Sequence, residues 1–198
     1  MKRASALLAL LPLAGCVTLP LVNPPPAPQT IAFLDGRNFA LTQPMTFLIG
    51  KSGKSVTVPA GFVTDYASVP RSLQWMIAKQ GPYSRATVLH DYLYWTQACT
   101  RQQSDNLLWI MMVQSGVPAS QRATITDGVR IGGGPAWGRN TRRRASGVPR
   151  FLPVARYGLA DTMTWDQAQA ALVKEGAKDP ALPVDPAVCA LGDRRRVP

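Results

Sequence analysis

The stretch Met45-Thr46-Phe47-Leu48-Ile49-Gly50-Lys51-Ser52-Gly53-Lys54-Ser55-Val56-Thr57-Val58 decides the first part of the fold. Apolar and polar side chains alternate before Gly50 and again after Lys54, which is the period of two that a half-buried β-strand requires. Glycines in the intervening segment favour a tight reversal of the chain. The stretch predicts an antiparallel β-hairpin, and similar alternation extends the predicted β structure over residues 31–63.

The Gly-Lys-Ser sequence at residues 53–55 resembles the end of a phosphate-binding loop. That motif places another glycine five residues before Gly53 and continues into a helix. This chain has Leu48 at the earlier position, and the strand-like Val56-Thr57-Val58-Pro59 follows the turn. The segment is therefore interpreted as a hairpin turn and not as a nucleotide site.

The pattern becomes helical after Ser68. Ser68-Val69-Pro70 suits a helix start, because serine can accept hydrogen bonds from free N–H groups and proline fits the first turn. Glycine and proline then separate apolar stripes of helical period. The predicted helices cover residues 71–79, 84–98, 101 or 104 to 115, 119–131 and 164–175, with Ser84 and Thr164 as caps and a break at Gly132-Gly133-Gly134-Pro135.

These patterns together predict an α+β fold. We expect a small N-terminal antiparallel β-hairpin or sheet, then a helical body of three to four short helices, and then an irregular basic tail. The expected boundaries are 1–15 for a leader, 16–30 for a proline-rich tether, 31–138 for the folded domain and 139–198 for a basic, proline-rich extension with one helix. Proline fixes φ and donates no hydrogen bond, so the tether is expected to be extended.

The first sixteen residues resemble the leader of bacterial lipoproteins. Lys2 and Arg3 precede the apolar run 7–13, which is too short to span a bilayer as a helix. Leu13-Ala14-Gly15 then leads into Cys16, the residue that such a leader marks for lipidation. An ordinary secretory signal is the alternative. The resemblance implies a lipid-anchored protein of the cell envelope, at the outer membrane and facing the periplasm.

Two further cysteines, Cys99 and Cys189, remain in the chain. In an oxidising compartment they are candidates for a disulfide, although the sequence alone does not place them side by side. Such a bond would close a loop over most of the domain and stabilise it by about 4–5 kcal/mol.

Several short motifs occur in a fixed order along the chain. Val58-Pro59-x-Gly61-Phe62-x-Thr64-Asp65-x-Ala67-Ser68-Val69-Pro70-Arg71 comes first, followed by His90-Asp91-x-Leu93-Tyr94, Arg101-x-x-x-Asp105, Val129-Arg130-x-Gly132 and Trp137-Gly138. The ordered set resembles the signature of DUF1353, a bacterial and phage family named only as a domain of unknown function, over about residues 35–138. Tyr66 departs from the aliphatic residue or phenylalanine that the resemblance leads us to expect. The resemblance implies a set of site residues but no reaction.

A divalent metal ion is the first chemistry that these residues suggest. Asp65, His90 and Asp105 are expected to converge on it, with Asp91 orienting His90, because two carboxylates and one imidazole can leave a position open for an activated water. The His-Asp pair also resembles the HD phosphohydrolases. Those enzymes need a further histidine, and His90 is the only histidine of the chain.

Two alternatives stay open beside the metal site. In the first, Ser68 is a nucleophile, His90 its base and one of the aspartates the orienting acid. In the second, the same residues are structural: they cap helices, and the arginines at 71, 101 and 130 pair with acids in a buried polar network. The sequence therefore predicts either a hydrolytic envelope lipoprotein of the DUF1353 family or a non-catalytic binding or structural lipoprotein.

The net charge of +11 at pH 7 implies an acidic partner. Arg142, Arg143 and Arg144 are the candidate residues for binding an anionic surface, and a solvated basic tail is the alternative. Export to the envelope argues against nucleic acid. An anionic envelope polymer or lipid is therefore the expected partner, in addition to the membrane that the N-terminal lipid would enter.

Overall fold

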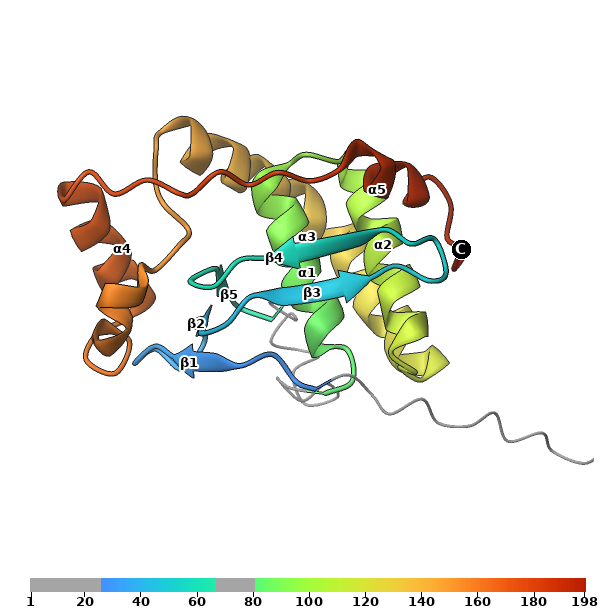
Figure 1. The fold of residues 1–198 in the computed structure, drawn as a ribbon, viewed down its shortest axis with the longest axis horizontal. Helices are drawn as coiled ribbons and strands as arrows, with labels where there is room; N and C mark the ends of the chain where they lie inside the picture. The colour runs from blue at the N-terminus through green and yellow to red at the C-terminus, as the bar shows by residue number, and fades with distance from the viewer. Residues whose placement is uncertain (1–25, 67–80) are drawn as a thin grey trace, which may run out of the picture.

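The computed structural model describes residues 26–66 and 81–198 (Figure 1). The predicted leader 1–15, Cys16, the first part of the tether, Ser68 and the predicted helix 71–79 lie outside the described residues. No helix within the described part of the chain is both long enough and apolar enough to cross a membrane.

The β structure consists of two small antiparallel sheets. One contains β1 (Thr30–Ala32), β2 (Phe39–Leu41) and β5 (Val63–Thr64) in the order β1-β2-β5. The other is the predicted hairpin of β3 (Met45–Leu48) and β4 (Ser55–Val58), with Met45 opposite Val58 and Leu48 opposite Ser55. Gly50 and Gly53 both adopt positive φ, which glycine tolerates at no steric cost. The predicted α+β class with a small N-terminal sheet is confirmed.

Helices make up most of the remaining chain. They are α1 (Ser84–Thr96), α2 (Arg101–Gln114), α3 (Ala119–Ala145), a 3₁₀ helix at Val154–Leu159, α4 (Trp165–Lys174) and α5 (Pro186–Leu191). Thr100 caps α2 and Thr164 caps α4, each in a capping box with the glutamine three residues later. Tyr83, and not the predicted Ser84, is the N-cap of α1, and Ser84 Oγ instead accepts a hydrogen bond from the backbone N–H of Gly81.

The predicted break at residues 132–135 is wrong, because α3 runs through it to Ala145. Pro135 removes one backbone donor, but contacts with α1 hold the second half of α3 in place. Asn140 Nδ2 donates to the Tyr94 carbonyl at 3.1 Å, and Gln97 Nε2 donates to the Trp137 carbonyl at 3.0 Å. Gly133 is buried where a Cβ would lie 2.5 Å from the Tyr94 hydroxyl. Tertiary packing therefore outweighs the low helix propensity of this segment.

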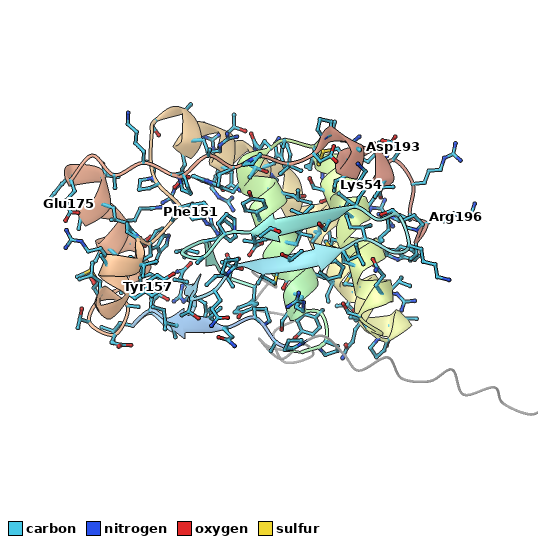
Figure 2. All side chains as sticks on the ribbon, viewed as in Figure 1. Lys54, Phe151, Tyr157, Glu175, Asp193 and Arg196 are labelled. Carbon is cyan, nitrogen blue, oxygen red and sulfur yellow. A yellow bond between two sulfur atoms is a disulfide. The ribbon has the colours of Figure 1, made fainter. Side chains whose placement is uncertain are left out.

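The predicted irregular tail is also wrong for its first part. Arg142, Arg143 and Arg144 form the last turn of α3, so they lie on a regular helix. The chain then returns to the sheets, where the Leu152 N–H donates to the Gly61 carbonyl at 2.8 Å and Phe151 packs on Phe62. Phe151 lies within the body of the molecule in Figure 2. The segment after residue 138 thus contributes to the same core as the segment before it.

Two hydrophobic clusters organise the molecule. The larger lies between the β3–β4 hairpin and helices α1 and α2, and it includes Val188 and Cys189 of α5. The smaller lies where Phe33 beside β1 meets Trp165 and Leu172 of α4. The last part of the chain runs back along the body and ends with α5 beside α2 (Figure 1).

A disulfide fixes this return. Cys99, just before α2, is bonded to Cys189 of α5, and the two residues are 90 positions apart in the sequence. Lys54 in the β3–β4 turn also forms an ion pair with Asp185, just before α5, at 3.1 Å (Figure 2). Covalent and polar contacts therefore join the C-terminal segment to both the helices and the hairpin.

Candidate functional site

Helix α1 directs the two residues of the His-Asp motif to different partners. His90 and Asp91 are consecutive, so their side chains leave the helix axis about 100° apart. His90 meets α2, whereas Asp91 meets the end of β5. The residues that the motif places together in the sequence therefore belong to two clusters in the structure.

The first cluster, which we call the histidine network, centres on Asp105 of α2. Its Oδ1 lies 3.0 Å from His90 Nε2 and accepts a hydrogen bond from the Tyr94 hydroxyl at 2.5 Å. Its Oδ2 accepts from Arg101 Nη1 at 3.3 Å, across one turn of the same helix. His90 is 4% exposed and Asp105 is 8% exposed. Three donor groups therefore converge on one buried carboxylate between α1 and α2.

Aromatic rings cover the histidine network. The Tyr94 ring lies 4.1 Å from the His90 ring and 5.1 Å from the Trp137 ring of α3, measured between centroids. Burial, and then the neighbouring Asp105, raises the pKa of Tyr94 well above its ordinary value, so the hydroxyl remains a donor. The cluster thus joins three helices, and its polar groups are used within it.

The second cluster, which we call the carboxyl pair, contains Asp65 and Asp91. The Asp91 carboxyl hydrogen-bonds Asp65 and accepts from Thr64 Oγ1 at 2.6 Å. Thr64 Oγ1 itself accepts from the Tyr66 backbone N–H at 3.0 Å, so its single proton is directed to Asp91. The pair therefore lies where β5 ends against the middle of α1.

Burial is the main reason that the pKa of Asp91 is raised to about 7, and the negative charge of Asp65 acts in the same direction. Arg150 and the Thr64 hydroxyl favour the ionised form and limit the rise. Arg150 is held by its Nε, which donates to the Val63 carbonyl at 2.8 Å, and it lies over the rings of Phe62 and Trp95. Asp91 is thus a carboxyl group that titrates near neutral pH beside a second carboxyl group.

The backbone next to the carboxyl pair is strained. Tyr66 has a φ of 58°, a left-handed conformation that a residue with a Cβ rarely adopts. Its ring is buried against Phe39, and its hydroxyl lies 3.2 Å from Thr30 Oγ1, so packing holds the conformation. Residues held in such conformations cluster at functional sites. The strain immediately follows Asp65 and is a second indication that this position is specialised.

The predicted three-ligand metal set is not assembled by these contacts. Within residues 26–66 and 81–198, no three side chains of histidine, cysteine, aspartate or glutamate are grouped so that they could hold a metal ion. The reason is geometric, because α1 lies between the surface that carries His90 and the surface that carries Asp91. Asp105, and not Asp91 as expected, is the carboxylate that orients His90. Ser68 lies outside the described residues, so its pairing with His90 stays a prediction.

Some residues of the two clusters had sequence signals and others had none. Tyr94 lies four positions after His90, so helical spacing alone places both on one face. Arg101 was expected to pair with an acid, and it does so with Asp105. Arg150 lies outside the matched motifs and reaches Asp91 only because the chain folds back after α3. No local pattern indicates that contact.

The fold and the two clusters define a class: a small α+β domain in which a buried histidine network joins two helices and a carboxyl pair lies at the edge of the sheet. Residues 39–129 match the family described as "Protein of unknown function (DUF1353)", and the chain belongs to this family. The match falls inside the residues that the sequence motifs indicated. No curated protein and no solved structure matches the chain.

Proposed function

We propose that this protein is a cell-envelope lipoprotein whose DUF1353 domain hydrolyses an anionic envelope polymer, with the carboxyl pair Asp65 and Asp91 as its acid–base group. The leader pattern ending at Cys16 supports the location. The net charge of +11 supports an acidic substrate. The titration of Asp91 near neutral pH, beside Asp65, is the observation that carries the catalytic part.

The carboxyl pair can perform both proton transfers of a hydrolysis. With one proton shared between the two groups, the ionised carboxylate accepts a proton from the attacking water, and the protonated carboxyl donates its proton to the leaving group. Exchange across their hydrogen bond returns the pair to its starting state. A group that titrates near the working pH is suited to both steps.

Metal-dependent hydrolysis remains a separate expectation. The carboxyl pair offers oxygen ligands, which suit hard divalent ions such as Mg²⁺ or Ca²⁺. Binding of such an ion would displace the shared proton. The assay below therefore includes protein that has been treated with a chelator and protein that has been supplemented with a divalent ion.

The test uses the full chain, extracted in detergent, with isolated murein and lipopolysaccharide as separate substrates. We expect release of soluble fragments, and we expect Asp91→Asn or Asp65→Asn to lower the rate at least about 100-fold, since proton transfer contributes roughly 10²–10⁴. Asp161→Asn, at an exposed position of the same charge, is the matched control. Equal rates for Asp91→Asn and Asp161→Asn would show that the carboxyl pair is not catalytic.

A second candidate function is a non-catalytic binding or structural lipoprotein. The histidine network favours it, because His90, Tyr94 and Arg101 all spend their hydrogen bonds on Asp105. This candidate predicts that the wild-type chain binds envelope polymers without cleaving them. It also predicts that replacing His90 lowers stability and leaves that binding unchanged.

A further inference from the structure

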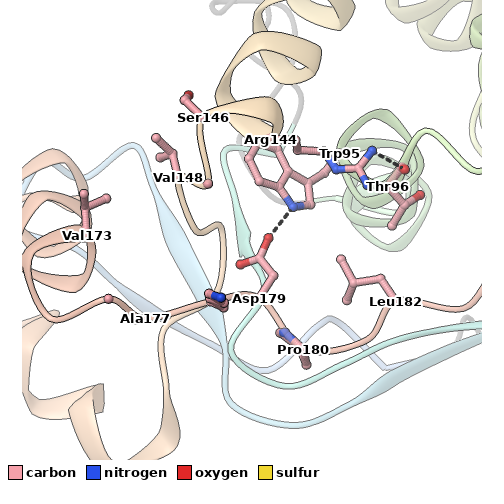
Figure 3. A pocket seen from close by; sticks show the side chains of 13 residues that line it. Trp95, Thr96, Arg144, Ser146, Val148, Val173, Ala177, Asp179, Pro180 and Leu182 are labelled. Carbon is pink, nitrogen blue, oxygen red and sulfur yellow. Dashed lines mark hydrogen bonds between the residues drawn. The ribbon is translucent and has the colours of Figure 1, made fainter.

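A pocket of about 540 Å³ lies apart from both clusters. It is formed where the last turn of α3, the end of α1 and the segment between residues 173 and 182 meet (Figure 3). Its volume is within the range of pockets that bind small molecules. Apolar side chains such as Val148, Val173 and Leu182 line part of it, and charged side chains line the rest.

Two cations in this pocket have no carboxylate partner. Arg144 Nη1 donates to the Thr96 carbonyl at 2.6 Å, which fixes the guanidinium while its other N–H groups remain available (Figure 3). Lys178 also lines the pocket. In the described part of the chain, neither residue forms an ion pair with an acid. An orientated guanidinium with free N–H groups is suited to a carboxylate or a phosphate.

Asp179 is the one acid among the lining residues, and its oxygens are already used. Oδ2 accepts from the buried Trp95 indole N–H at 2.7 Å, and Oδ1 accepts from the Arg150 backbone N–H at 2.7 Å. These bonds hold the segment after α4 against α1, as the Trp95–Asp179 contact in Figure 3 shows. Asp179 therefore acts as a structural acceptor, and it balances only one of the two cations.

The surroundings of the pocket add to its positive potential. Burial, and then the positive charges of Arg150 and Arg139, lowers the pKa of Arg143, which is the neighbour of Arg144 on α3. Like charges are therefore crowded beside the pocket, and only Asp166 opposes them at Arg143. A bound anion would relieve this repulsion.

We propose that this pocket binds a small acidic ligand, the size of one sugar residue, whose carboxylate or phosphate contacts Arg144 and Lys178 while its ring packs on the apolar lining. The proposal does not depend on the hydrolytic function or on the carboxyl pair. It assigns Arg144 a ligand-binding role that differs from the diffuse surface attraction expected of Arg142 and Arg143.

The test is calorimetric titration of the full chain with three amino sugars. N-acetylmuramic acid carries a carboxylate, N-acetylglucosamine 1-phosphate carries a phosphate, and N-acetylglucosamine is the neutral match. We expect at least one acidic probe to bind and the neutral sugar to bind at least about tenfold more weakly, which corresponds to about 1.4 kcal/mol. The two acidic probes distinguish a carboxylate from a phosphate as the recognised group.

Three variants locate the binding. Arg144→Gln and Lys178→Gln are each expected to weaken the acidic probe at least about fivefold, as the loss of a charge-assisted hydrogen bond implies. Arg142→Gln removes the same charge from the same turn of α3, outside the pocket lining, and is expected to leave binding unchanged. Lys178→Gln also guards against misfolding of Arg144→Gln, because Lys178 makes no hydrogen bond among the described contacts.

Three results would overturn the proposal. The first is the absence of binding of either acidic probe at about 10 mM, ten times a weak dissociation constant. The second is equal binding of the neutral sugar. The third is equal weakening by Arg142→Gln and Lys178→Gln, which would show that net charge and not the pocket attracts the ligand.

Discussion

His90 of α1 and Asp105 of α2 are joined by a hydrogen bond of 3.0 Å between Nε2 and Oδ1, and both side chains are buried. The Tyr94 hydroxyl and Arg101 also donate to Asp105. This carboxylate is therefore the point at which the helical body is held in register. Its removal leaves buried donors without an acceptor, which is more costly than the loss of one surface contact.

Asp105→Ala is expected to lower the free energy of unfolding by about 3 kcal/mol, because it breaks a buried pair and orphans two buried donors. Urea denaturation followed by circular dichroism measures the change. Asp127→Ala removes an acid at an exposed position of α3 and should change stability by less than about 0.5 kcal/mol. Equal stability of the two variants would contradict a structural role for the histidine network.

The carboxyl pair predicts a specific dependence of stability on pH. Asp91 ionises near its ordinary pKa of 3.8 in the unfolded chain and near 7 in the folded protein. Between these values the folded state binds more protons than the unfolded state. The contribution of Asp91 to stability is therefore complete below about pH 4, decreases as the pH rises to about 7, and is constant above that. The decrease is at most about 4 kcal/mol, at 1.36 kcal/mol for each unit of pKa.

Asp91→Asn tests this slope, because asparagine cannot ionise. The difference in stability between the variant and the wild type should shift in favour of the variant as the pH rises from 4 to 7. Denaturation midpoints measured across that interval report it. Asp161→Asn, at an exposed position, should keep the slope of the wild type. A pH-independent difference for Asp91→Asn would mean that Asp91 does not titrate in this range.

Two glycines of the same helix should respond in opposite directions to alanine. Gly133→Ala places a Cβ 2.5 Å from the Tyr94 hydroxyl and is expected to destabilise the protein by about 1–3 kcal/mol, as overpacking does. Gly132→Ala meets no atom within 4 Å, so it should stabilise the protein by about 0.5–1 kcal/mol through helix propensity. Thermal unfolding of both variants checks the prediction. Stabilisation by Gly133→Ala would show that α3 does not pack on Tyr94 as described.

The Cys99–Cys189 disulfide closes a loop between residues 90 positions apart, so its loss should cost about 4–5 kcal/mol. Dithiothreitol should lower the urea midpoint of the wild type accordingly. The double variant Cys99→Ser/Cys189→Ser should have the lower midpoint from the start and should not respond to the reductant. A wild type that is insensitive to complete reduction would contradict the prediction.

Local patterns predicted the parts of the fold that depend on nearest neighbours in the chain. The β3–β4 hairpin follows from alternation and two turn glycines, and the caps at Thr100 and Thr164 follow the rule for short polar side chains at a helix start. Thr164 was predicted from the sequence, whereas Thr100 was not, because the start of α2 was placed at Arg101 or Ser104.

The candidate site was only partly predictable. Helical spacing places His90 and Tyr94 on one face, but it does not show that Asp105 of another helix faces them. The proposed convergence of Asp65 with His90 failed because two consecutive residues of a helix point about 100° apart. Arg150 was missed because it reaches Asp91 through a return of the chain.

The sequence by itself determined the elements, the ordered motifs of the DUF1353 family and the strong positive charge, because each of these depends on residue type and short spacing. Tertiary structure alone decided three features: the continuation of α3 through Gly132–Pro135, the division of the His-Asp motif between two clusters, and the closing of the disulfide. Each depends on contacts between segments far apart in the chain. Their free energy exceeds local propensities of about 1 kcal/mol or less for each residue, apart from proline.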